Sequence, residues 1–186
     1  MLPSGQFGRC QDCNTTDVMH VVASKIKDAW WTCKVTTALF LDVQDVFPNM
    51  VKAQLIHNMR ECGVPCNYTS LIETMLTNKK THLKFDDYIS PPLSINNGTT
   101  QGCLLSMILY VFYNALLIDT AHHKYETSSG FVDDCMYLVI GDFLPETHVM
   151  VKDMMERQDG SFLWSTSHNS LFKLSKLILM NFPRSH

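Results

Sequence analysis

Apolar residues recur along the first part of the chain with the period of a helix and then with that of a strand. A helical face begins after Thr16, which we expect to cap the helix. The apolar positions of this face lie three or four residues apart: Val18, Val22, Ile26, Ala29 and Cys33. An apolar run from Ala38 to Val43 follows, and it predicts a strand that carries a single charge at Asp42.

Two further helices are predicted before residue 80. The first begins at Phe47-Pro48, where proline suits the first helical turn, and it runs to about Cys62 and ends at Gly63. The second covers Tyr68 to Asn78. Seven apolar side chains of these helices are expected to face the core: Val51, Leu55, Met59, Leu71, Ile72, Met75 and Leu76.

The period changes to two at Lys80, where the alternation predicts a hairpin that turns at Asp86-Asp87. A short strand after Pro91-Pro92 leads into a loop bracketed by glycines, Asn97 to Gly102. The loop opens onto an apolar stretch, Leu104 to Ile118, which predicts a buried core helix. That stretch is shorter than the roughly 20 residues that a membrane span needs, so we expect no membrane association.

The last third of the chain predicts a second hairpin, a helix and a final strand. Gly130-Phe131-Val132 leads into a turn at Asp133-Asp134, and the apolar run Cys135 to Ile140 leaves it. A helix follows Pro145, with Val151, Met154 and Met155 inward, and then a polar loop from Trp164 to Asn169 and a strand from Leu177 to Phe182. Strands and helices do not alternate strictly, so the α+β class is predicted.

Length and composition indicate one intracellular domain. The chain has 186 residues, 46% of them hydrophobic, with 15 Lys and Arg against 18 Asp and Glu. This balance excludes binding to nucleic acid by bulk positive charge alone, so any such role must depend on specific residues. Seven cysteines, an odd number, and no apolar leader behind a basic start favour a reduced protein that is not secreted.

Three carboxylates stand where folding alone would not place them. Asp42 lies inside an apolar strand, and Asp133-Asp134 lies between two apolar strands. Carboxylates converging from neighbouring strands would suit hard divalent cations such as Mg²⁺, which take oxygen ligands and assist phosphoryl transfer. Asp-Asp is also ordinary turn chemistry, as at Asp86-Asp87, and composition alone does not rank one pair above the other.

The order of the motifs resembles the reverse transcriptase of non-LTR (LINE-like) retrotransposons, fungal members especially. The resemblance extends from Gln6 to Ser185. Five blocks match in register: Gln6-Phe7-Gly8-Arg9 with Thr15-Thr16-Asp17, Leu39-Phe40-Leu41-Asp42-Val43 with Phe47-Pro48, Asn97-Gly98-Thr99-Thr100-Gln101-Gly102 with Leu105-Ser106 and Leu109-Tyr110, Gly130-Phe131-Val132-Asp133-Asp134, and Trp164-Ser165 with His168-Asn169-Ser170, Phe172 and Lys176.

This resemblance implies a polymerase palm-like fold, antiparallel strands packed on helices, with a partial fingers region over about residues 1–37 and the palm over about 38–186. It implies an RNA-directed DNA polymerase that adds deoxynucleotides to a primer 3′ end on an RNA template. A nuclear location fits the family. The chain would lack the thumb and the upstream part of the fingers, so processive activity is not expected.

The resemblance also assigns the site. Asp42, Asp133 and Asp134 would be catalytic carboxylates that hold two Mg²⁺ ions, with Mn²⁺ as a substitute and the Val43 carbonyl as a further ligand. Lys176 would protonate or neutralise the leaving pyrophosphate. Phe47 would contact the incoming nucleotide and exclude a 2′-hydroxyl. Three further residues would contact nucleotide or template: Arg9, Gln101 and Gly102.

Several positions depart from the family pattern. The proline that usually follows Gln-Gly is absent from Cys103-Leu104-Leu105-Ser106, and Val46 replaces a small residue before the aromatic of the first block. The basic run after Gly8 has lost a glycine and a basic residue. These departures leave a catalytically inactive retrotransposon remnant as the main alternative. A zinc module built from Cys10-x-x-Cys13 and Cys62-x₃-Cys66 is a second alternative.

Overall fold

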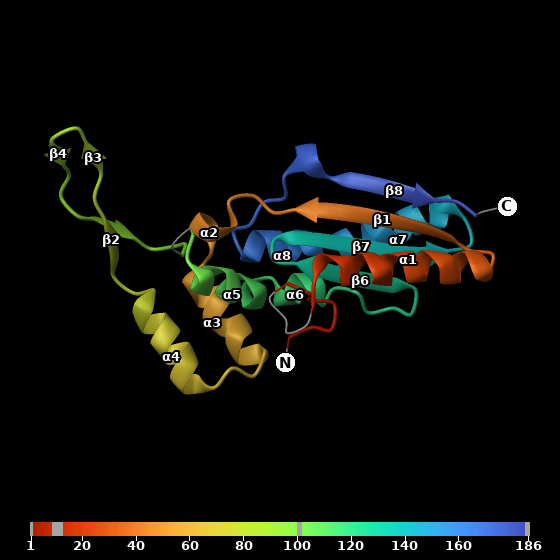
Figure 1. The fold of residues 1–186 in the computed structure, drawn as a ribbon, viewed down its shortest axis with the longest axis horizontal. Helices are drawn as coiled ribbons and strands as arrows, with labels where there is room; N and C mark the ends of the chain where they lie inside the picture. Colours follow the sequence, from red (N-terminus) through yellow and green to blue (C-terminus); the bar gives the residue numbers. More distant parts are fainter. Residues whose placement is uncertain (1, 9–12, 100–101, 185–186) are drawn as a thin grey trace.

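The structure is a computed structural model that describes residues 2–8, 13–99 and 102–184. Its centre is a four-stranded antiparallel sheet in the order β6-β7-β1-β8 (Figure 1). The strands are β1 (Val35–Asp42), β6 (Glu126–Phe131), β7 (Asp134–Gly141) and β8 (Ile178–Phe182). The mixture of helices and antiparallel strands confirms the α+β class.

Helices cover both faces of this sheet. On one face, α1 (Thr15–Trp31) packs through Val22 and Ile26 on Met136 and Leu138 of β7. The opposite face carries the larger core, a cluster that includes Tyr137 and Val139 of β7 and buried side chains from four of the helices. These helices are α5 (Leu104–Tyr113), α6 (Ala115–Ile118), α7 (Leu144–Glu156) and α8 (Ser161–Ser167). Side chains that alternate along each strand therefore fill two separate cores.

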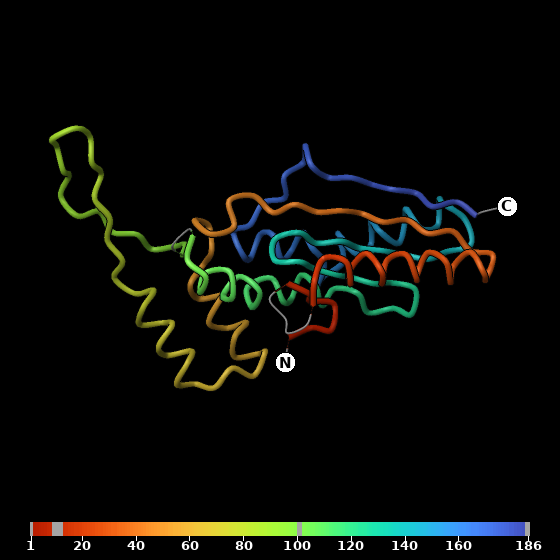
Figure 2. Tube along the Cα trace, viewed as in Figure 1, coloured from red at the N-terminus to blue at the C-terminus, as the bar shows by residue number. Residues whose placement is uncertain are grey.

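A second group of elements extends from one end of the sheet. It begins with α2 (Val46–Asn49), α3 (Lys52–Glu61) and α4 (Cys66–Met75). An arm of short antiparallel strands then projects away from the body, as the trace in Figure 2 shows. The arm contains β2 (Lys79–Thr81) paired with β5 (Leu93–Ile95), and β3 (Lys84–Phe85) paired with β4 (Tyr88–Ile89). As predicted, Asp86-Asp87 forms its turn.

The predicted start of the first helix was wrong by two residues. Asn14, and not Thr16, is the N-cap: its side chain accepts a hydrogen bond from the Asp17 amide, whose carboxylate in turn accepts one from the Asn14 amide. This reciprocal pair satisfies two helix-end donors, which a cap at Thr16, two residues later, would leave open. Cys33 is also outside the helix, exposed and with a positive φ of 56°.

Three other predicted elements need correction. The helix after Phe47 breaks at Met50 into α2 and α3, and the apolar stretch from Leu104 breaks at Asn114 into α5 and α6. In α4 only Ile72 of the four predicted inward side chains is buried, because this helix packs mainly on α3 and leaves Leu71 and Met75 exposed.

The predicted polar loop at residues 164–169 was also wrong. Most of it belongs to α8, and Trp164 and His168 are buried. The later strand is confirmed as β8, preceded by a short 3₁₀ helix, η1 (Leu174–Lys176). Within the described residues, no helix is long and apolar enough to cross a bilayer.

Candidate active site at the end of the central sheet

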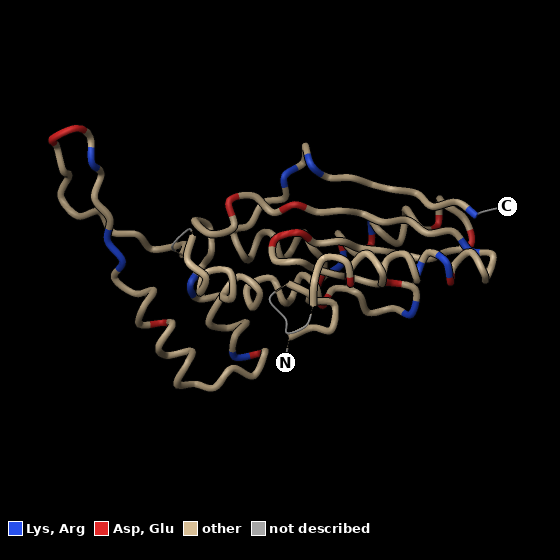
Figure 3. Tube along the Cα trace, in the orientation of Figure 1, with Lys and Arg blue, Asp and Glu red and all other residues tan. Residues whose placement is uncertain are grey.

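The register of the two central strands brings two of the predicted carboxylates together. Asp42 is the last residue of β1 and lies directly opposite Asp134, the first residue of β7. Side chains of directly opposed residues in antiparallel strands start about 5 Å apart and leave the sheet on the same face. In Figure 3 the acidic segments at the end of β1 and at the β6–β7 turn lie at the same end of the sheet.

The turn that carries Asp133 is shifted by one residue from the prediction. Phe131 pairs with Asp134, so Val132 and Asp133 form the turn and Asp134 belongs to the strand. Val132 adopts a left-handed φ of 61°, which is unusual for a β-branched residue. The Asn114 side chain donates a hydrogen bond to the Val132 carbonyl, which fixes this turn from the break between α5 and α6.

Lys176 reaches the same place from the far end of the sequence. Its Nζ donates to Asp42 Oδ1 at 2.9 Å. The chain around it is tied to the end of β1, because the Lys173 amide donates to the Asp42 carbonyl and the Gln44 amide to the Leu171 carbonyl. These bonds position η1, and with it the lysine, beside the carboxylates.

The electrostatics of this cluster favour an additional cation. Burial raises the pKa of Asp134, and the charges of Asp133 and Asp42 raise it further, whereas Lys176 acts in the opposite direction. The hydrogen bond to Asp42, and then the charge of Asp42, raise the pKa of Lys176. Three carboxylates thus face one ammonium group, and a hard divalent cation would relieve their repulsion.

Val43 follows Asp42 and pairs with Phe172 as an isolated antiparallel bridge. The two hydrogen bonds that flank this bridge use the Asp42 carbonyl and the Gln44 amide. The Val43 carbonyl takes part in neither bond. This backbone arrangement is compatible with the predicted role of that carbonyl as a ligand.

The structure also brings Phe47 next to the glycine-bracketed segment. The Thr99 amide donates to the Phe47 carbonyl at 2.7 Å, and the Gly98 amide donates to the Met50 carbonyl at 2.7 Å. A side chain at Gly98 would meet the Pro48 carbonyl oxygen, because a Cβ there would lie 2.6 Å from it. The segment therefore lies directly on α2, against the backbone of Phe47 and Pro48.

Tyr110 is a neighbour of the site to which sequence reasoning gave no separate role. It is fully buried on α5, and its ring centroid lies 6.1 Å from that of Phe47. Its hydroxyl has no hydrogen-bond partner in the described part of the chain. Burial raises the pKa of this phenol, and the charges of Asp133 and Asp42 add to the effect.

Some of the remaining predicted residues lie outside the part of the chain that the structure describes. Arg9, Cys10 and Gln101 are not among the described residues. Gly102 has a φ of 82°, which glycine adopts without strain, and the space around its Cβ position is open. Despite the missing proline, α5 begins at Leu104, immediately after Cys103.

The described residues do not form a ready metal centre. Within residues 2–8, 13–99 and 102–184, no group of three or more His, Cys, Asp and Glu side chains is arranged to hold a metal ion. The oxygen donors of Asp42 and Asp134 nevertheless fit Mg²⁺ chemistry, and their opposed positions fit a shared ligand. For the zinc alternative, Cys13 and Cys66 are exposed, and Cys62 is partly buried.

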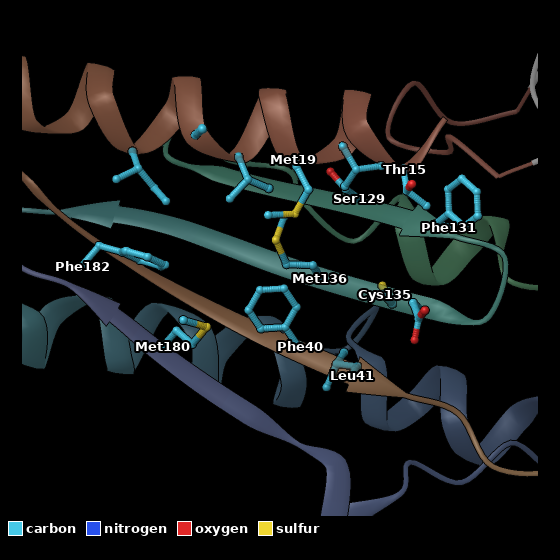
Figure 4. A pocket seen from close by; sticks show the side chains of 15 residues that line it. Thr15, Met19, Phe40, Leu41, Ser129, Phe131, Cys135, Met136, Met180 and Phe182 are labelled. Atoms are coloured by element: carbon cyan, nitrogen blue, oxygen red, sulfur yellow. The ribbon is translucent and has the colours of Figure 1, made fainter. Parts of the chain in front are cut away.

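An apolar groove runs along the face of the sheet that also carries Asp42 and Asp134. It has a volume of about 570 Å³ and lies between α1 and the strands. Figure 4 shows Met19, Phe40, Met136 and Met180 around it. Because the lining is almost entirely apolar, the groove is not itself a phosphate-binding site.

Comparison with known proteins supports the relationship suggested by the motifs. No protein-family model matches the chain. It is 27% identical over 113 residues to a probable RNA-directed DNA polymerase from transposon X-element of Drosophila melanogaster, which covers 60% of this chain and 12% of that protein. A probable RNA-directed DNA polymerase from transposon BS of the same organism is 26% identical over 124 residues, 66% of this chain and 14% of that protein.

The fold has counterparts among solved structures. Apo telomerase from Candida tropicalis, truncated from its C-terminal domain, superposes with a TM-score of 0.70 at 11% identity, covering 97% of this chain and 37% of that one. Telomerase from Candida albicans in complex with a fragment of telomeric RNA gives a TM-score of 0.52 at 12% identity, over 95% and 32%. The resemblance to non-LTR retrotransposon polymerases and the palm-like fold are therefore both confirmed. The chain spans only about an eighth of the length of these curated relatives.

Proposed function

We propose that this chain, whose sequence relatives are RNA-directed DNA polymerases of transposons, is the palm of such an enzyme and carries the site of nucleotidyl transfer. The observation that carries the proposal is the opposition of Asp42 and Asp134 at the end of two central strands, with Asp133 in the adjoining turn. The reaction adds a deoxynucleotide to the 3′ end of a primer under the direction of an RNA template. Residues from about 38 onward are assigned to the palm and residues before them to part of the fingers.

In this proposal Asp42, Asp133 and Asp134 hold the divalent cations, with the Val43 carbonyl as a further ligand. Bound Mg²⁺ supplies activation of the primer hydroxyl and neutralisation of charge on the triphosphate. No protein nucleophile is required, so the contribution of the chain is positioning and electrostatics.

Lys176 has two roles here. Its ammonium group donates to Asp42, which keeps it at the site, and its side chain is still 54% exposed. It can therefore donate a proton or a hydrogen bond to the leaving pyrophosphate from its solvent side. Phe47 lies beside the sugar of the incoming nucleotide and excludes a 2′-hydroxyl by its bulk.

The test is primer extension on an RNA template with Mg²⁺ or Mn²⁺, using intact protein, Asp42→Asn and Asp133→Asn. Either substitution is expected to lower extension at least about a hundredfold, because each removes a charge that the transition state requires. The matched control is Asp86→Asn with Asp87→Asn. This pair has the same residues in another turn, at the tip of the arm, and we expect it to leave extension unchanged.

Mn²⁺ binding measured by calorimetry separates the remaining alternatives. An intact protein that binds Mn²⁺ but extends no primer, and that loses binding in Asp42→Asn, is the inactive retrotransposon remnant. Equal extension by the intact protein and both variants would refute catalysis at these carboxylates. Zinc that copurifies and is lost on replacing Cys62 and Cys66 would favour the zinc module instead.

A further inference from the structure

The segment Asn97–Thr99 is held on two sides. On one side its amides donate to α2 and to the residue that follows it: the Thr99 amide donates to the Phe47 carbonyl and the Gly98 amide to the Met50 carbonyl. On the other side its carbonyls accept hydrogen bonds from a single ammonium group. Lys79 Nζ donates to the Asn97 carbonyl at 3.0 Å and also to the Gly98 carbonyl.

Lys79 is well placed to transmit order from the arm to this segment. It is the first residue of β2 and pairs with Ile95 of β5, so it stands at the base of the arm, where the chain returns towards the site. Its side chain also lines a small cavity of about 90 Å³ with Leu76 and Leu105. The ammonium group is thus directed to the two carbonyls by a stem that packs on apolar side chains.

The surroundings of Lys79 indicate that the hydrogen bonds to these two carbonyls are the main interactions that offset the burial of its charge. Burial lowers the pKa of the ammonium group, and the nearby charge of Lys52 lowers it further. In the described part of the chain Lys79 forms no ion pair with a carboxylate. Hydrogen bonds that involve a charged group are stronger than neutral ones, so losing them should release the segment.

We propose that Lys79 is a positioning residue that fixes Asn97–Thr99 and, through the Thr99 bond to the Phe47 carbonyl, fixes Phe47 against the incoming nucleotide. This inference rests on the function proposed above. It adds a residue from the base of the arm to the machinery that selects deoxyribonucleotides. Lys79 touches neither substrate nor metal in this role, and it acts only through the backbone that it holds.

Lys79→Met is the decisive variant, because methionine keeps an unbranched side chain for the cavity and removes the ammonium group. Lys80→Met is the matched control: Lys80 is the next residue of β2, is exposed, and pairs with Ser94. Lys79→Arg tests rescue, since a guanidinium group restores a charged donor.

Single-nucleotide primer extension measures the effect. Lys79→Met should raise KM for the deoxynucleotide about tenfold, the size expected for losing a charged hydrogen bond, while kcat changes less than KM. The preference for deoxyribonucleotides over ribonucleotides should fall as well, because the segment Asn97–Thr99 would no longer fix the position of Phe47. Lys80→Met should match the intact protein, and Lys79→Arg should recover part of the loss.

Amide hydrogen exchange gives a readout that does not need catalysis. The Gly98 and Thr99 amides should exchange at least about tenfold faster in Lys79→Met than in Lys80→Met, with amides of β1 and β7 unchanged. Exchange and KM both equal to those of Lys80→Met would overturn the inference. If the intact protein extends no primer, the proposed function fails, whereas faster exchange at Gly98 and Thr99 would still establish that Lys79 holds the segment.

Discussion

His168 should make the stability of the fold depend on pH over a defined acidic range. The ring is buried, stacks on Trp164 with centroids 4.9 Å apart, and contacts the edge of Tyr113. Its Nδ1 lies 3.0 Å from the Trp164 carbonyl, so this nitrogen carries the proton, and Nε2 accepts from the Asn58 amide at 3.1 Å. If Nε2 also carried a proton, its N–H would face the N–H of the Asn58 side-chain amide, and this hydrogen bond would be lost.

The size of the effect follows from the pKa. Burial lowers the pKa of His168 from 6.5 to about 4, the hydrogen bond to the Trp164 carbonyl acts in the opposite direction, and the charge of His57 lowers it further. The unfolded chain therefore binds more protons between these values, and stability is present above pH 6.5 and is lost as the pH falls towards 4. Between about pH 7 and about pH 4.5 the free energy of unfolding should fall by about 2 kcal/mol from this residue alone.

Urea unfolding followed by tryptophan fluorescence at several pH values measures this loss. His168→Gln cannot titrate, so its stability should fall less on acidification than that of the intact protein, by about 2 kcal/mol. His20→Gln changes an exposed histidine on α1 and should keep the full pH dependence. A pH dependence of His168→Gln identical to that of the intact protein would refute the reasoning, as would an NMR titration midpoint of His168 above about 6.

Two other pairs of variants test local features. Gly98→Ala should lower stability by about 2 kcal/mol more than Gly102→Ala in urea unfolding. Both positions have a positive φ, but of the two only Gly98 would place a Cβ against backbone, 2.6 Å from the Pro48 carbonyl oxygen. Equal losses of stability would contradict this. Tyr110→Phe should leave stability unchanged or raise it by up to about 1 kcal/mol, because it removes a buried hydroxyl without a partner. Tyr113→Phe should lower stability by about 1 to 2 kcal/mol, because its hydroxyl accepts from the Val51 amide at 3.0 Å and donates to the His168 carbonyl. Equal effects of the two tyrosine substitutions in thermal unfolding would exclude this difference.

The sequence allowed prediction of the strands that carry the carboxylates, because an acid inside an apolar run is visible in the pattern itself. Asp42 lies at the end of β1, and Asp134 lies at the start of β7. The exact turn was missed by one residue, since it depends on Asn114, which lies between α5 and α6 and donates to the Val132 carbonyl 18 residues further along the chain.

Polar segments were the least predictable. The composition of residues 164–169 is typical of a loop, yet His168 is satisfied by Asn58 of α3, which no local pattern reveals. Lys79 was similarly missed, because the carbonyls that it binds follow it by 18 and 19 residues. In both cases the partner of a polar group decides its position, and that partner is fixed only by the tertiary fold.

Along the sequence, the arm lies between the strands that together form the site. Its tip at Asp86-Asp87 projects from the body, and the central sheet takes β1 from before the tip and β6, β7 and β8 from after it. A cut at the tip would leave Asp42 on one fragment and Asp133, Asp134 and Lys176 on the other. Since β1 lies between β7 and β8, the two fragments could restore the carboxylate pair only by inserting one strand into the middle of the other fragment's sheet. The tip is thus a natural place to divide this chain into two complementing halves whose reassembly reports on formation of the sheet.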